Sequence, residues 1–141
     1  APASANSAKD WSSPAYDAIS VPGGTPGTAI GSGYQNTMAI IAQGNNNPAN
    51  SAAAYAQAYR GGSLTDWYMP STLELKELAT KYSSFSSDAT FTGAPAVSWE
   101  WWTSTEASSN QAYTVRISDN GGPWDNTKGS NPNPVRPIRS F

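Results

Sequence analysis

Glycine and proline follow one another so closely in the first quarter of the chain that no long helix can form there. The segment from Trp11 to Gly33 contains three prolines and five glycines. Proline removes a backbone N–H and clashes with the preceding turn of a helix, and glycine costs more backbone entropy on ordering than other residues. We therefore expect an extended, turn-rich layer here, packed onto the core by Trp11, Tyr16, Ile19 and Val21.

Helices are predicted between this segment and the middle of the chain. Residues 51–60 are rich in alanine, carry Tyr55 and Tyr59 at i and i+4, and stop at two glycines. Residues 36–43 fit either a short helix or a buried strand, because their periodicity does not separate the two. The clearest helix begins at Ser71, which with Glu74 three residues later makes a capping box. Its buried stripe is Leu75, Leu78, Ala79 and Tyr82.

The second half of the chain has the pattern of strands. Residues 98–105 are aromatic and β-branched, and alternating apolar side chains between residues 113 and 117 indicate a strand with one buried face. Residues 119–122, Asp-Asn-Gly-Gly, predict a hairpin turn with residues 124–128 returning, and residues 135–141 predict a last strand. Helices followed by strands favour an α+β fold with a small antiparallel sheet and two or three helices. We expect a single domain over residues 13–141, preceded by a linker over residues 1–12.

Composition excludes several classes of function. The 141 residues include no His and no Cys, which excludes His-based triads, Cys nucleophiles and the usual zinc sites. Charged residues make up 13% and the net charge is −2, whereas nucleic-acid binders usually carry a basic excess. No stretch approaches the roughly 20 apolar residues of a membrane span. Glu100 and Glu106, the best carboxylate pair for glycoside hydrolysis, would lie about 20 Å apart along a strand, so we expect no enzyme and no cofactor.

Three blocks of sequence resemble one bacterial family. Residues 61–71 read Gly-Gly-Ser-Leu-Thr-Asp-Trp-Tyr-Met-Pro-Ser and precede Glu74-Leu75; residues 101–106 read Trp-Trp-Thr-Ser-Thr-Glu. Residues 135–141 close the chain with Val-Arg-Pro-Ile-Arg-Ser-Phe. In this order the blocks resemble the "GG…DWRLPS…EL", "YWSSTE" and "VRPVRAF" segments of the family of the C-terminal domain of the Legionella collagen-like adhesin. The resemblance covers residues 33–141.

The resemblance implies both a fold and a function. The fold would be similar to C-type-lectin-like domains, and the domain would lie outside the bacterium, on the cell surface or secreted. It would form a homotrimer at the end of a collagen-like stalk, to which residues 1–12 would connect. It would bind sulfated glycosaminoglycans, heparin-like or heparan sulfate-like polysaccharides, on host cells. Since the chain begins at Ala1 rather than Met, we also expect it to be a fragment of a longer protein.

Basic residues are the candidates for such binding, because Arg and Lys recognise sulfate as they recognise phosphate. Glu106 lies in an aromatic block and needs a partner, for which Arg136 or Arg139 is the expected choice. Outside this predicted structural ion pair, Arg116, Lys128 and Arg60 are the predicted glycan-binding residues. Since one subunit carries −2, a concentrated positive face would need three assembled copies.

Two alternatives remain open from the sequence. A calcium-dependent lectin-like site for neutral sugars is one, because hard oxygen ligands are concentrated near the predicted hairpin. These are Asp119, Asn120, Asp125, Asn126, Asn131 and Asn133. A purely structural trimerisation cap for a collagen-like stalk is the other.

Overall fold

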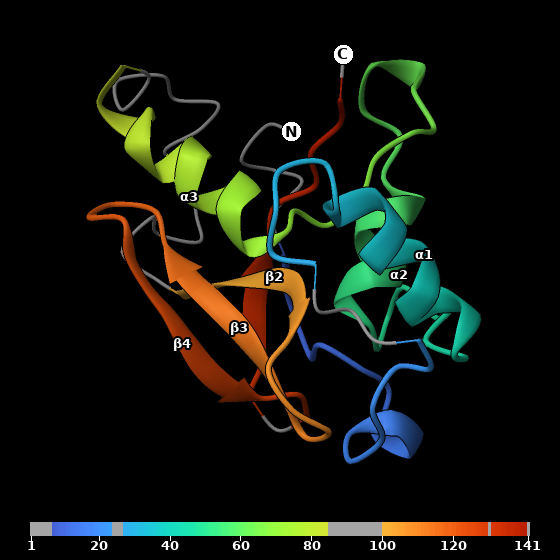
Figure 1. Ribbon diagram of the computed structural model, residues 1–141. Helices are drawn as coiled ribbons and strands as arrows, with labels where there is room; N and C mark the ends of the chain where they lie inside the picture. Colours follow the sequence, from blue (N-terminus) through green and yellow to red (C-terminus); the bar gives the residue numbers. More distant parts are fainter. Residues whose placement is uncertain (1–6, 24–26, 85–99, 130, 141) are drawn as a thin grey trace.

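The chain folds into a small α+β domain with three α-helices and two antiparallel sheets (Figure 1). The computed structural model describes residues 7–23, 27–84, 100–129 and 131–140. The predicted α+β class with an antiparallel sheet is confirmed. In Figure 1, α1 and α2 lie together on one side, α3 lies on the other, and the larger sheet occupies the lower left of the view.

The helices follow their sequence signals. α1 spans Gly33–Ala42, α2 spans Ala52–Ala58 and α3 spans Thr72–Thr80. Residues 36–43, left open as helix or strand, are therefore helical up to Ala42. The capping box at the start of α3 is complete, with Ser71 Oγ accepting from the Glu74 backbone N–H and Glu74 accepting in return from the Ser71 N–H. Short 3₁₀ turns occupy Pro14–Tyr16, Gly61–Ser63 and Tyr82–Ser84.

The larger sheet contains three strands in the order β2–β3–β4, with bounds Glu100–Glu106, Gln111–Arg116 and Gly121–Thr127. The predicted hairpin joins β3 to β4, and Trp124 lies opposite Thr114 in the ladder. A smaller sheet pairs β1, Ser7–Lys9, with β5, Asn133–Val135. The closing segment is only partly a strand, because beyond β5 it makes a single bridge between Ile138 and Tyr68.

The larger sheet has apolar packing on both faces. On one face Trp101, Val115 and Ile117 pack with Leu75 of α3. On the opposite face Trp102 joins a second cluster, in which α1 and α2 pack with the smaller sheet. The members of that second cluster include Trp11, Val21, Ile40, Ala53, Met69, Trp102, Ala112 and Val135. Polar side chains with intermediate exposure lie at both ends of the sheet, at Glu100 and Arg116 and again at Glu106 and Gln111.

The N-terminal segment corrects two predictions. Ser7–Lys9 lies inside the predicted linker but forms β1, and the fully buried Trp11 donates its indole N–H to Thr103 O at 2.8 Å. Residues 7–12 therefore belong to the folded domain, because Trp11 buries its side chain in the core and β1 forms backbone hydrogen bonds with β5. Residues 1–6 of the predicted linker lie outside the described residues. Val21 is buried as predicted, whereas Ile19 is 51% exposed and does not pack onto the core.

No helix in the described ranges combines the length and the apolar character needed to cross a bilayer.

Candidate polysaccharide-binding surfaces

Lys128, one of the three predicted glycan-binding residues, is buried inside the domain. Its side chain is 0% exposed, and its ammonium pairs with the Glu106 carboxylate. Nζ also donates to the backbone oxygens of Ser109 at 2.7 Å and Ile19 at 3.2 Å, and it lies 4.9 Å from the centre of the Trp11 ring. Three acceptors satisfy its three N–H groups. The prediction for Lys128 is therefore wrong, because a buried ammonium cannot reach a polyanion in solvent.

The structural ion pairs differ from those predicted. Glu106 binds Lys128, and Arg139 instead binds Asp66, with Arg139 Nη2 at 2.8 Å from Asp66 Oδ2. The hydrogen bond from Arg139 lowers the pKa of Asp66 below its ordinary value. This pair joins the C-terminal segment to the loop before α3. Arg136, the other predicted partner, is buried at 4% exposed. Sequence spacing does not reveal these partners, because the pairs form across strands and loops distant in the chain.

Arg116 lies on the surface but is engaged on two sides. Its guanidinium Nη1 lies 3.0 Å from Asp119 Oδ2, and its Cζ lies 4.8 Å from the centre of the Trp124 ring. The pKa of Asp119 is lowered, first by the Gly121 backbone N–H and then by Arg116. Glu100 lies directly opposite Arg116 in the β2–β3 ladder. Two carboxylates, those of Asp119 and Glu100, therefore lie beside the Arg116 guanidinium.

Arg60 lies in a different setting, at the end of α2 and beside a cavity. Pro48, Tyr55, Ala58, Tyr59 and Arg60 line a hollow of about 310 Å³, and no Asp or Glu is among these lining residues. Arg60 is exposed, and its Nη1 donates to the backbone oxygens of Gln57 and Tyr59 at 2.7 and 2.8 Å. These two bonds orient the guanidinium and leave its other N–H groups for an anion.

The two tyrosines of this hollow have separate supports. The Tyr59 ring lies 4.9 Å from that of Trp67 and meets it edge to face. Lys9 Nζ lies 5.3 Å from the centre of the Tyr55 ring. Burial raises the pKa of Tyr55 above its ordinary value. We call Lys9, Tyr55, Tyr59 and Arg60 the α2 pocket. Lys9 was not predicted, because no sequence signal links β1 to α2.

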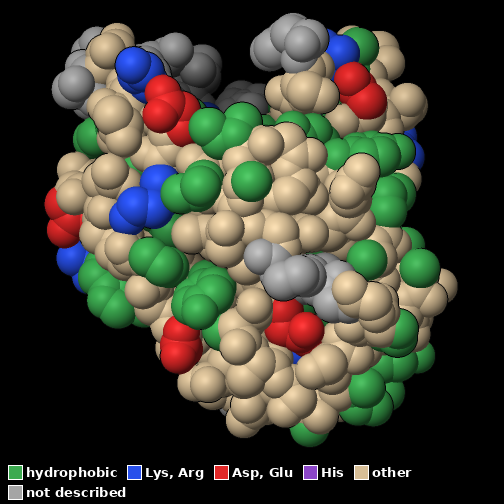
Figure 2. Space-filling model, viewed as in Figure 1, with side chains coloured by type: hydrophobic (Ala, Val, Ile, Leu, Met, Phe, Trp, Pro, Cys, Tyr) green, Lys and Arg blue, Asp and Glu red, His purple; other side chains and the backbone are tan. Residues whose placement is uncertain are grey.

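Basic side chains do not gather into one broad patch. Figure 2 shows Lys and Arg in small separate spots, several of them beside Asp or Glu. The sequence contains eight Lys and Arg residues, and four form ion pairs within the described part of the chain. Lys76 donates to the backbone oxygens of Asn120 and Gly122. Recognition of an anion therefore requires a local arrangement: Arg60 lines the hollow beside α2, Lys9 lies over its Tyr55 ring, and no Asp or Glu is among the lining residues.

The residues suggested for calcium are dispersed along β4. Asp119 precedes this strand and Asn131 follows it, so the two ends are separated by about 20 Å of extended chain. Asn131 Nδ2 donates to Asn126 Oδ1 at 2.9 Å, and Asn126 Nδ2 donates to Glu100. Within the described residues no group of three or more His, Cys, Asp or Glu side chains is placed to hold a metal ion. The calcium alternative therefore has no group of carboxylates behind it in this part of the chain, and its asparagine oxygens stay a prediction.

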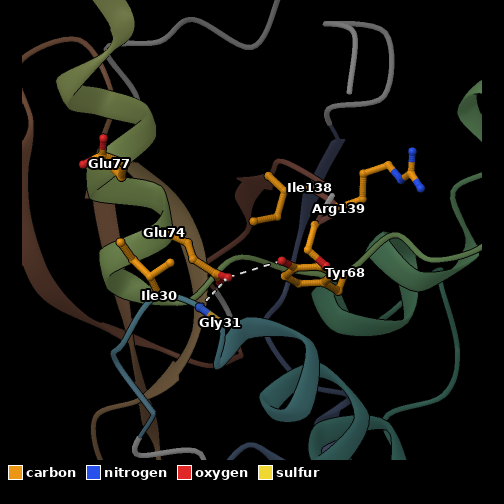
Figure 3. Close-up of a pocket in the computed structure, with 8 residues that line it drawn as sticks. Ile30, Gly31, Tyr68, Glu74, Glu77, Ile138 and Arg139 are labelled. Carbon is orange, nitrogen blue, oxygen red and sulfur yellow. Dashed lines mark hydrogen bonds between the residues drawn. The ribbon is translucent and has the colours of Figure 1, made fainter.

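A second hollow, of about 280 Å³, lies between α3 and the C-terminal segment (Figure 3). Glu74 and Glu77 of α3 line one side, and Ile138 and Arg139 line the other. Glu74 accepts hydrogen bonds from Gly31 N, Ser71 N and the Tyr68 hydroxyl, so its carboxylate is occupied. Burial, and then the nearby Glu74, raises the pKa of Tyr68. Because the Glu74 carboxylate is occupied, this groove is suited to apolar contact and not to polar recognition.

The fold and these surfaces define a small α+β domain with one open aromatic pocket containing cations. Comparison of the chain with protein-family models and with curated proteins finds no match. The family resemblance in the three sequence blocks therefore stays a prediction.

Proposed function

We propose that the domain is the head of an extracellular bacterial adhesin, which binds sulfated polysaccharide at the α2 pocket and acts as a homotrimer. The observation that carries the proposal is the placement of Arg60 beside the tyrosine-lined hollow, with Lys9 over the Tyr55 ring. A pyranose ring has an apolar face that can lie against an aromatic side chain, while its substituents reach outward. Arg60 and Lys9 would then meet the sulfate groups.

The local charge favours the α2 pocket over the surface around Arg116 as the site for a sulfated chain. Lys9 and Arg60 give two positive charges, and the lining of the hollow contains no carboxylate. At Arg116 one cation is accompanied by Asp119 and Glu100. A polyanion gains Coulomb energy near the first group and is repelled by the carboxylates of the second.

Trimer formation is the second part of the proposal. Ile30, Tyr34 and Leu73 are 68%, 49% and 44% exposed, and they lie on segments connected by a hydrogen bond from Leu73 N to Thr28 O. The groove of Figure 3 adds Ile138, with Glu77 on one wall and Arg139 on the other. In a threefold ring this exposed apolar surface of one copy would lie against the next copy. We propose this face as the contact between copies, which would triple the number of α2 pockets available to one chain.

Chromatography on immobilised heparin with a rising NaCl gradient tests the binding. The wild type should elute at increasing salt because screening weakens ionic contacts. Arg60→Glu and Lys9→Glu should each weaken binding at least about tenfold, the size of one lost charge-assisted hydrogen bond. Lys81→Glu is the matched control, because Lys81 is exposed on α3 and the substitution changes the net charge equally. Equal losses in all three variants would mean that net charge, and not the pocket, governs retention.

Light scattering of Ile30→Asp separates assembly from binding. We expect this variant to be monomeric, with an unchanged α2 pocket and weaker retention on heparin because avidity is lost. A wild type that is trimeric yet elutes from heparin together with Arg60→Glu would favour a structural trimerisation cap without polysaccharide binding.

A further inference from the structure

The open end of the larger sheet carries a second arrangement of aromatic and polar side chains. Alternation along strands places Thr114 and Arg116 of β3 on the same face as Trp124 and Asn126 of β4. Glu100 of β2 reaches the same face, since its Oε2 accepts from Thr114 Oγ1 at 3.0 Å and from Asn126 Nδ2 at 2.6 Å. We call these five residues the sheet-face cluster. The pocket proposed above for sulfated polysaccharide uses none of them.

Trp124 is the aromatic surface of this cluster. Its side chain is 37% exposed, whereas Trp11, Trp101 and Trp102 are completely buried. The Arg116 guanidinium lies 4.8 Å from its ring centre, and Asp119 binds the guanidinium in turn. These contacts fix the indole on the sheet before any ligand arrives, which reduces the entropy lost on binding. A fixed, partly exposed indole is suited to contact the apolar C–H face of a pyranose.

Glu100 supplies the polar group that a sugar needs, and Asn126 holds it in place: the Asn126 amide donates to Glu100 Oε2 at 2.6 Å and to Thr114 Oγ1 at 2.8 Å. Glu100 Oε2 is held by two donors, and Oε1 accepts no hydrogen bond from the described residues. The carboxylate is therefore oriented, with one oxygen left to accept from hydroxyl groups. Two strand spacings separate β2 from β4, about 10 Å, and the Asn126 amide bridges that interval. One sugar ring on Trp124 would therefore place its hydroxyls near the Glu100 carboxylate.

The charge of the cluster selects against sulfated chains. Arg116 is the single cation of the five residues, and Asp119 already neutralises it at 3.0 Å. Glu100 adds a further negative charge beside the proposed sugar. A sulfate here would meet net repulsion, whereas neutral hydroxyls can donate to the free carboxylate oxygen.

We propose that the sheet-face cluster is a second binding site, which takes a neutral hexopyranose without calcium. Trp124 stacks on the ring, Glu100 binds its hydroxyls, Asn126 positions the Glu100 carboxylate, and Arg116 positions the indole. A head with both sites binds two chemical classes of sugar, a sulfated chain at α2 and a neutral residue at the sheet.

Heteronuclear NMR with neutral sugars tests this site. Oligosaccharides of glucose, galactose and mannose are added to the full chain in EDTA and high salt, and the Trp124 indole N–H signal is assigned by its loss in Trp124→Phe. We expect at least one of the three to shift that signal, and to bind Trp124→Ala about thirtyfold more weakly, as for truncation of an aromatic hot spot. Glu100→Gln should also weaken binding, since an amide replaces the free acceptor. Tyr113→Ala is the matched control, because Tyr113 is a partly exposed aromatic of β3 that alternates with Thr114 and so lies on the opposite face of the sheet.

Two results would overturn the proposal. One is the absence of any shift of the Trp124 signal with all three sugars, and the other is a shift that calcium restores after EDTA abolishes it. Arg60→Glu should leave the neutral-sugar response unchanged, and Trp124→Ala should leave heparin retention unchanged. Failure at one site is thereby distinguished from failure at the other.

Discussion

Lys128 and Arg60 are both cations beside aromatic rings, yet they lie in opposite surroundings. Lys128 contacts Trp11 and is completely buried, with Glu106 and two backbone oxygens as acceptors. Arg60 lies at the rim of the α2 pocket, is exposed, and bonds only the end of its own helix through Nη1. The difference teaches that burial, more than residue type, decides whether a basic side chain serves the scaffold or a ligand.

Removal of the buried cation should have the largest effect on stability. Lys128→Ala leaves the Glu106 carboxylate without its ammonium in a largely dry site, and we expect a loss of about 3–5 kcal/mol in the free energy of unfolding. Urea unfolding followed by tryptophan fluorescence measures it. Lys128→Met with Glu106→Leu should recover part of the loss, because no charge is then left buried. A change below about 1 kcal/mol in Lys128→Ala would place this pair among ordinary surface ion pairs.

The aromatic neighbour of the buried cation should matter next. Trp11→Phe removes the indole N–H that binds the buried Thr103 oxygen, and we expect a cost of about 1–3 kcal/mol. Tyr59→Phe in the α2 pocket is the matched comparison and should cost less than about 0.5 kcal/mol. Thermal unfolding of the two variants beside the wild type shows whether the order holds. A larger loss in Tyr59→Phe would reverse the contrast between the two regions.

The exposed cation should hardly affect stability. Arg60→Ala is expected to change the free energy of unfolding by less than about 0.5 kcal/mol while it weakens retention on heparin. Urea unfolding and elution from heparin in a salt gradient are measured on the same preparation of the variant. Parallel losses of stability and of binding would show that Arg60 supports the end of α2, and the pocket would then have no separate role.

Substitutions of two aspartates should change stability least, and at neutral pH the two changes should have opposite signs. Arg139 lowers the pKa of Asp66, so its contribution is present above the ordinary value of 3.8 and is lost as pH falls through the lowered pKa. Burial, and then Asp17, raises the pKa of Asp10, so its ionised form opposes folding at neutral pH. Asp66→Asn should therefore lower the urea midpoint at pH 7, and Asp10→Asn should raise it.

Acid titration of the same two variants provides the control. Both differences from the wild type should shrink once the pH is well below 3.8, because the two carboxyls are then protonated in the folded and unfolded chains alike. Differences of the same sign in the two variants at pH 7 would contradict the assignment of the two environments.

Local sequence signals predicted much of the secondary structure, but they could not predict contacts between distant segments. Ser71 and Glu74 specify the start of α3 within four residues, and the hairpin turn between β3 and β4 is equally local. The partner of Glu106 is not local, because Lys128 reaches it only after the hairpin returns. Burial of Lys128 and the approach of Lys9 to Tyr55 depend on how distant segments pack. Local patterns therefore name basic residues as candidates, whereas the packing of distant segments decides which of them reach the surface.

The pairing of β1 with β5 has a mechanical consequence. Ser7 lies opposite Val135 at the outer end of a three-residue pairing, and the Trp102 indole holds Lys9 O at 2.7 Å just inside it. Tension applied at Ser7 would first break the few backbone hydrogen bonds between β1 and β5. The force would then act on the hydrogen bonds of two buried tryptophans, Trp102 and Trp11, which connect this segment to the larger sheet. A pull from this end is thus carried into the centre of the domain, and resistance should rise abruptly after the first few ångströms of extension.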